Sequence, residues 1–349
     1  MNILYLTPSN PNFKSPETGY AEQLAKLGHS VTFSNGYQPE LLNRKGRYDI
    51  VYGAMEYSMN MATWFGKKLN IPIYNHIEWI PPWRVGVEDP KTWGYDNTTT
   101  NIISEEAIKY WIPIYIQQMM DWENCTVRSM PGETLKQYLE PWATKPLKTE
   151  IKYYAANFEQ LEKYKRDSTE KKNQIISIAR FVPHKRIHHI IQALALLKNP
   201  PTYKLVGYGN EMPMLEKLAD KLGVKIDFVG PGANGIKERL LQESLFNVNI
   251  WAGLPMAEGY YYKIPSVTYD EHHIREVFGE APEYVERNNI KQLAEKIQYM
   301  LDNPKYRVEK GEKAHELMMN DKINMGTPEK LMKKLETIMY KGIDIFEGH

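Results

Sequence analysis

The sequence has a single cysteine among its 349 residues, and it has no long apolar run. Cys125 alone cannot form an intramolecular disulfide or a multi-cysteine zinc site, and a lone cysteine fits a reducing compartment. No apolar stretch approaches the ~18 residues that a membrane-spanning helix needs, and the apolar start at residues 1–6 is shorter than a signal peptide. These absences predict a cytoplasmic protein.

The sequence also lacks an excess of charge of either sign. Its 44 Lys plus Arg residues balance 43 Asp plus Glu, for a net charge of +1. There is therefore no electrostatic argument for a nucleic-acid partner. Peripheral membrane contact stays open, because Arg44, Lys45 and Arg47, or Lys67 and Lys68, could form a local basic patch. No Asp-x-Asp pair, a common metal-binding motif, occurs in the sequence.

The length of 349 residues and a hydrophobic content of 42% predict a folded protein of two domains. Seven of the eight tryptophans lie in the first half, and only Trp251 lies in the second. Residues 77–122 are rich in aromatic and turn residues, so we expect them to border a cleft, where flat rings could stack on sugars. Ordinary core packing is the alternative for most of these rings.

Short apolar runs alternate with helical patterns along the whole chain, and this alternation is typical of doubly wound parallel sheets. In the first half we expect strands at 1–7, 30–34, 48–52, 71–74, 125–128 and 150–154. In the second half we expect strands at 175–179, 203–206, 225–229, 248–251 and 266–269. The last helices, 290–301 and 328–340, show no strand between them.

A charged passage after Tyr154 predicts the connection between the domains. We expect an N-terminal Rossmann-like domain at 1–169 and a C-terminal Rossmann-like domain at 170–325. Residues 326–349 are expected to form a C-terminal helix, for which packing back towards the first domain is an open alternative.

The segment 174–185, QIISIARFVPHK, is the centre of the functional hypothesis. A β-branched apolar run predicts a buried strand, and Arg180 and Lys185 stand just past its carboxyl end. Ligands of open parallel sheets bind at that end, where two cations could hold the two phosphates of a nucleotide. The alternative is two solvated surface cations beside a proline turn.

Three motifs of the second half stand out: RFVPHK at 180–185, KLVGYG at 204–209 and GLPMAEGYYYKIP at 253–265, which runs on through SVTYDEHHIREV at 266–277. Through them the second half resembles the family 4 glycosyltransferases. The resemblance covers most of residues 174–304 and only weakly the first half. It implies an α/β protein of GT-B architecture, in which an N-terminal acceptor-binding Rossmann-like domain at 1–169 and a C-terminal donor-binding one at 170–325 face each other across a cleft.

The resemblance also implies roles for individual residues. Arg180 and Lys185 would bind the donor diphosphate, and Glu258 would accept hydrogen bonds from the ribose hydroxyls. His76, at a strand end of the first domain, resembles a cleft histidine of the family. The turn with Gly207 and Gly209 and the helix start at Gly253, Leu254, Pro255 and Met256 would contribute to donor binding, the latter through backbone amides.

The sequence departs from the family pattern at one important position. The family has a glutamate eight positions before the one matched by Glu258, where it contacts the transferred sugar; here that position is Ile250. A shortened loop with Trp251 or Ala252 in its place is one explanation. A zinc site at His184, His188 and His189 is disfavoured, because no carboxylate motif or cysteine accompanies them.

The resemblance implies a retaining, metal-independent transferase without a cofactor. It would move a hexose-type sugar from a nucleotide diphosphate donor, a UDP- or GDP-sugar, to a hydroxyl acceptor. The acceptor stays open among a saccharide, a lipid and a protein glycan. Two alternatives remain: a nucleotide-sugar-binding protein without turnover, which the change at Ile250 favours, and a nucleotide-sugar epimerase, which would need acid and base carboxylates at the sugar.

Overall fold

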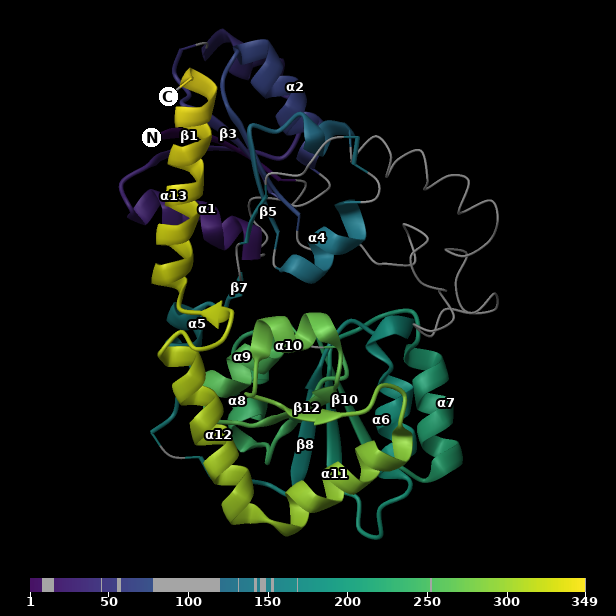
Figure 1. The fold of residues 1–349 in the computed structure, drawn as a ribbon. Coiled ribbons are helices and arrows are strands. Elements are labelled where there is room, and N and C mark those ends of the chain that lie inside the picture. The colour runs from purple at the N-terminus through teal and green to yellow at the C-terminus, as the bar shows by residue number, and fades with distance from the viewer. Residues whose placement is uncertain are drawn as a thin grey trace, which may run out of the picture. The chain divides into compact units, whose positions relative to one another are not determined.

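The computed structural model describes residues 1–7, 16–44, 46–54, 58–77, 120–130, 132–140, 143–144, 149–151, 154–167, 169–251 and 253–348. The chain divides into two compact units (Figure 1). Among the described residues, unit 1 contains the first half and the segment from Pro328 onwards, and unit 2 runs from Tyr154 to Thr327. Each unit is an α/β body around a parallel sheet.

Unit 1 contains a six-stranded parallel sheet in the order β2-β1-β3-β4-β5-β6. The central strands are buried on both faces, which explains why β1 reads as a nearly continuous apolar run. The strands are β1 (Asn2–Leu6), β2 (Ser30–Ser34), β3 (Ile50–Ala54), β4 (Ile73–His76), β5 (Val127–Met130) and β6 (Thr149–Ile151). The helices are α1 (Pro16–Lys26), η1 (Pro39–Arg44), α2 (Met59–Leu69), α4 (Glu133–Leu139) and α13 (Pro328–Glu347).

The long C-terminal helix α13 is part of unit 1 although the chain reaches it only after unit 2. It lies beside α1 and β5 (Figure 1). Gly342 lies so close to β5 that an added methyl group would come within 2.6 Å of Val127 Cγ1. Buried Leu335 and Met339 give the helix an apolar face.

Unit 2 contains a second six-stranded parallel sheet, in the order β10-β9-β8-β11-β12-β13. A separate two-stranded sheet joins β7 to β14. The strands are β7 (Tyr154–Ala155), β8 (Gln174–Ile178), β9 (Thr202–Val206), β10 (Ile226–Gly230), β11 (Asn247–Val248), β12 (Ser266–Tyr269), β13 (Glu283–Val285) and β14 (Met325–Gly326). The helices are α5 (Phe158–Lys163), η6 (Pro183–Lys185), α6 (Ile187–Leu194), α7 (Met212–Leu222), α8 (Ile236–Glu243), α9 (Leu254–Tyr261), α10 (His272–Phe278), α11 (Ile290–Asp302) and α12 (Pro304–Met319).

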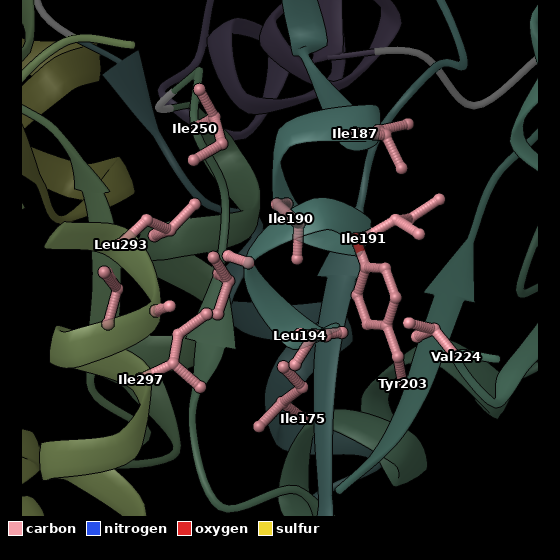
Figure 2. Packing of buried hydrophobic residues seen from close by; sticks show 14 of the residues in the cluster. Ile175, Ile187, Ile190, Ile191, Leu194, Tyr203, Val224, Ile250, Leu293 and Ile297 are labelled. Carbon is pink, nitrogen blue, oxygen red and sulfur yellow. The ribbon is translucent and has the colours of Figure 1, made fainter. Parts of the chain in front are cut away.

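Consecutive residues of β8 serve opposite faces of this sheet, as the period of two along a strand requires. Ile175 packs in the larger core cluster, with side chains of α6, α7 and α11 (Figure 2). Its neighbour Ile176 packs on the other face with Leu240 and Leu241 of α8. Helices therefore cover both faces, and the predicted α/β fold with two doubly wound sheets is confirmed.

Several local predictions need correction. We expected no strand between the last helices, but β14 lies there; it has two residues and pairs with β7, far away in the sequence. Helix α12 and strand β13 were missed as well. Strand β4 extends past Tyr74 and includes Asn75 and His76, and Asn75 Nδ2 donates to the Gly53 carbonyl at 3.0 Å inside the sheet. The predicted aromatic wall falls largely at 78–119, outside the described residues, and stays a prediction.

Candidate functional site

The strand order of unit 2 reverses between β8 and β11, and this places a topological switch point there. From β8 the chain moves outward to β9 and β10, then returns to β11 on the other side of β8. In open α/β sheets, ligands bind beyond the carboxyl ends of the strands at such a point. The segment after β8 carries Arg180 and Lys185, and the segment after β11 carries Trp251 and Gly253.

Arg180 and Lys185 remain available for an anionic ligand. Arg180 is exposed, and Lys185 lies at the end of η6, where it is partly buried. Among the residues that the structure describes, neither cation pairs with a carboxylate. Burial and, to a smaller extent, the charge of Arg180 together lower the pKa of Lys185 to about 7. Because no described carboxylate neutralises these two cations, they favour the binding of an anion.

The turn with Gly207 and Gly209 supports the backbone that carries Arg180. Gly207 has a φ of +138°, and a methyl group there would lie 1.8 Å from the Ala179 carbonyl oxygen; one on Gly209 would lie 2.3 Å from the Phe181 carbonyl oxygen. This close approach allows the Phe181 N–H to donate to the Tyr208 carbonyl at 2.9 Å. Both glycines therefore fix the segment around Arg180, and direct contact with a donor stays a prediction.

Helix α9 begins at Gly253 with few amides left for a ligand. Pro255 has no N–H, and the Met256 N–H donates to the Gly253 carbonyl at 2.9 Å. The Met256 side chain is buried in a core cluster. Of the four residues predicted here, Gly253 and Leu254 offer the amides that could face an anion, at the positive end of the helix dipole.

Glu258 lies in the second turn of α9 and accepts a hydrogen bond from Lys237 Nζ to its Oε1 at 2.6 Å. Its other oxygen, Oε2, is buried and has no hydrogen-bond partner among the described residues. Sequence reasoning predicted Glu258 but missed Lys237, because the sequence gives no sign that α8 lies next to α9.

The side chain of Ile250, at the position where the resemblance led us to look for a glutamate, lies in the core. Ile250 is 1% exposed, and its side chain belongs to the core cluster with Leu293 and Ile297 (Figure 2). Its carbonyl accepts from Thr268 Oγ1 at 3.2 Å. The side chain at this position therefore serves the fold and is not available to a sugar.

Trp251, the next residue, occupies the neighbourhood of the cations. Its ring centroid lies 5.5 Å from Lys185 Nζ, 5.3 Å from that of His184 and 4.8 Å from that of His273. Burial is the largest cause that lowers the pKa of His273, and the charge of Arg287 is the next; together with other nearby cations they lower it to about 3. This imidazole is therefore neutral. The sequence analysis predicted no binding role for Trp251 and placed it, with Ala252, in a shortened loop.

A buried carboxyl group, Glu211, was missed. It precedes α7, and its N–H donates to the Phe181 carbonyl at 3.2 Å. Its Oε2 has no hydrogen-bond partner among the described residues, and burial raises the pKa of Glu211 to about 7. The sequence signal was only its place directly after the glycine turn.

His76 belongs to unit 1, at the end of β4. It is buried, and its Nδ1 lies 2.8 Å from Ser129 Oγ on the neighbouring strand β5. Ser129 Oγ also hydrogen-bonds Tyr74 Oη at 2.5 Å. A network of three side chains thus fixes the imidazole, and its contact with a sugar or acceptor stays a prediction.

The described parts of the chain contain neither a metal-binding group of side chains nor a membrane-spanning helix. No group of three or more His, Cys, Asp or Glu side chains there could hold a metal ion. His189, considered above for zinc, has its Nδ1 2.8 Å from Tyr269 Oη. None of the described helices has the length and apolar character to cross a membrane.

Comparison with known proteins gave one family model and a group of similar solved structures. Residues 159–317 match the family model described as glycosyl transferases group 1. No curated protein gave a significant match to the sequence.

Solved structures are similar over nearly the whole chain. HepE from Anabaena in complex with UDP-glucose is 12% identical with a TM-score of 0.69, covering 98% of this chain and 100% of that one. Sucrose-phosphate synthase from Thermosynechococcus elongatus is 13% identical with a TM-score of 0.70, covering 98% and 99%. A glycosyltransferase from Rickettsia africae is 17% identical with a TM-score of 0.60, covering 98% of both. This chain therefore has the GT-B fold, and its match to glycosyl transferases group 1 supports a glycosyltransferase.

Proposed function

We propose that the protein is a retaining, metal-independent family 4 glycosyltransferase that moves a hexose-type sugar from a nucleotide diphosphate sugar to a hydroxyl acceptor. The observation that carries this proposal is the pair Arg180 and Lys185, which stands without a carboxylate partner among the described residues at the switch point of unit 2. UDP is the first donor nucleotide to test, because HepE was solved with UDP and with UDP-glucose. We further propose a cytoplasmic location.

The proposed chemistry depends on positioning and on charge. As the bond to the sugar breaks, negative charge grows on the leaving diphosphate, and Arg180 and Lys185 would stabilise it. An acceptor hydroxyl that attacks from the face the diphosphate leaves needs no protein nucleophile, provided both substrates are held in place. The backbone amides of Gly253 and Leu254 would add to this field at the start of α9.

A nucleotide-sugar-binding protein without turnover is the second candidate. The specific observation that favours it is the burial of Ile250, since the side chain at the family's sugar-contacting position lies in the core. The same diphosphate site would then bind a donor and release it unchanged. Turnover separates the two candidates, whereas binding alone does not.

The diphosphate site is tested by calorimetric titration of the protein with UDP, GDP and ADP in the absence of metal. We expect one nucleotide to bind, and Arg180→Ala or Lys185→Ala to weaken it more than about tenfold, or about 1.4 kcal/mol. Lys198→Ala is the matched control, because Lys198 is exposed and precedes β9, at the opposite edge of the same sheet. Equal binding by all variants would refute the site.

Turnover is tested with UDP-glucose and a panel of saccharide, lipid and protein-glycan acceptors, with hydrolysis by water as the lower limit. Transfer with retained anomeric configuration supports the transferase. Tight binding with neither transfer nor hydrolysis for the UDP-, GDP- and ADP-sugars would instead support the binding protein.

The affinity for the nucleotide should depend on pH through Lys185. With a pKa of about 7, the ammonium is mostly charged below pH 7 and mostly neutral above it. Since only the charged form binds the diphosphate well, we expect the affinity to fall about fivefold between pH 7 and pH 8. The terminal phosphate of UDP is already ionised over this range. Lys185→Arg keeps its charge, so its affinity should stay constant; an equal fall in this variant would assign the effect elsewhere.

A further inference from the structure

Lys237, the second residue of α8, is the hydrogen-bond partner of Glu258. Its ammonium lies 2.6 Å from Glu258 Oε1 and 3.6 Å from Glu238 Oε1. Glu238 Oε1 also accepts from Gln160 Nε2 at 2.8 Å and so has a second donor. For Glu258, Lys237 is the hydrogen-bond donor that the described residues supply.

The position of Lys237 is fixed by packing at the carboxyl edge of the sheet. A methyl group added to Gly232, in the turn after β10, would lie 2.6 Å from Val206 Cγ1 and 3.1 Å from Lys237 Cβ. Val206 is the last residue of β9. The stem of Lys237 is therefore held beside the end of β9, at the edge where Arg180 follows β8, and its ammonium reaches across to α9.

The charge balance of this contact is unusual for an interior position. The Lys237 side chain is 19% exposed and the Glu258 side chain 15%. Burial by itself would lower the pKa of Lys237, but Glu258 and then Glu238 outweigh it and the pKa is raised, so the ammonium keeps its charge. Glu258 Oε2, in contrast, is buried with no donor among the described residues, an arrangement that costs free energy unless a ligand supplies one.

We infer that Lys237 is a positioning residue for donor recognition. It holds Oε1 of Glu258 so that Oε2 faces the vicinal ribose hydroxyls of the bound nucleotide. This inference rests on the proposed nucleotide-sugar site, because it assumes that a nucleotide binds at the carboxyl edge of unit 2. Lys237, on α8, would thus determine whether the Glu258 carboxylate can bind the ribose of the nucleotide.

The inference is tested by calorimetric titration with UDP and with 2′-deoxy-UDP. We expect the unaltered protein to prefer UDP about tenfold, as the loss of a hydrogen bond to a charged group implies. Lys237→Met should reduce this preference to about threefold or less, mainly by lowering the affinity for UDP. Lys237→Arg should restore part of the preference. Lys204→Met is the matched control, since Lys204 pairs with an exposed carboxylate, Asp227, in the same unit; its preference should stay unchanged.

The ratio of the two affinities separates positioning from general support of the fold. If Lys237→Met lowers the affinities for UDP and for 2′-deoxy-UDP by the same factor, the inference is overturned. It is also overturned if the unaltered protein shows no preference between them. If Lys237→Met does not fold, the double variant Lys237→Met/Glu238→Gln is judged by the same ratio. Its second change removes the charge of Glu238, the other carboxylate that lies near Lys237. Failure of the unaltered protein to bind any of UDP, GDP and ADP refutes the proposed function itself, a result distinct from loss of the preference.

Discussion

Replacement of Ile250 by glutamate will destabilise unit 2 and will not restore contact with a sugar. The side chain is 1% exposed and belongs to the apolar core cluster that also contains Leu293 and Ile297 of α11 (Figure 2). A carboxylate there has no cation to pair with in the core cluster. We expect the free energy of unfolding to fall by about 3–5 kcal/mol, as for other uncompensated buried charges.

The pH dependence and a conservative variant identify the cause. Burial raises the pKa of a carboxyl group, so the loss caused by Ile250→Glu should be larger at pH 8 than at pH 5. Ile250→Val removes one methyl group and should cost about 1 kcal/mol at either pH. Chemical unfolding followed by circular dichroism measures both. A stable Ile250→Glu variant with faster turnover of UDP-glucose would show instead that this position faces the donor.

Loss of the buried ion pair between Arg186 and Glu271 should have an effect of similar size. Arg186 follows Lys185, is 1% exposed and donates from Nη1 to Glu271 Oε1 at 3.0 Å. Its φ of 47° and ψ of 39° are left-handed, a conformation that costs an arginine roughly 1–2 kcal/mol. The side-chain contacts must offset this cost, and through them η6 is tied to the residue before α10.

We expect Arg186→Met to lower the free energy of unfolding by about 3–5 kcal/mol, because Glu271 stays buried without its principal cation. Arg287 Nε, 3.6 Å from the same oxygen, compensates only in part. The nucleotide affinity should fall as well, since η6 ends at Lys185. Both quantities are measured on the same preparations, by unfolding and by titration with UDP.

A double-mutant cycle shows whether the pair is the cause. Glu271→Gln removes the charge and keeps the shape, and the double variant Arg186→Met/Glu271→Gln leaves no buried anion. We expect the double variant to lose less stability than the sum of the single losses, by about 1–3 kcal/mol. Additive losses would show that Arg186 acts through packing on Tyr269, whose ring centroid lies 5.8 Å from its guanidinium carbon, rather than through the ion pair.

The sequence by itself determined the class of the fold, and it predicted two cations for the candidate site. Strand and helix patterns are local, because they depend on the spacing of apolar residues within a few turns of a helix or a few residues of a strand. The alternation of these patterns predicted two doubly wound sheets, and the strand end before Arg180 and Lys185 predicted where an anion would bind. The order and spacing of the motifs in the second half then pointed to a GT-B protein before any contact was known.

Only the tertiary structure decided which residues meet across elements. It turned Ile250 into the core, joined Lys237 of α8 to Glu258 of α9, paired β14 with β7 and placed α13 in unit 1. It also explained why glycines stand at 207 and 209, because the backbone of the neighbouring turn leaves no room for a Cβ atom at either position. The physical reason is that burial, pairing and close packing depend on neighbours brought together by the whole sheet, whereas the pattern of residues along the chain carries only the local preferences of each element.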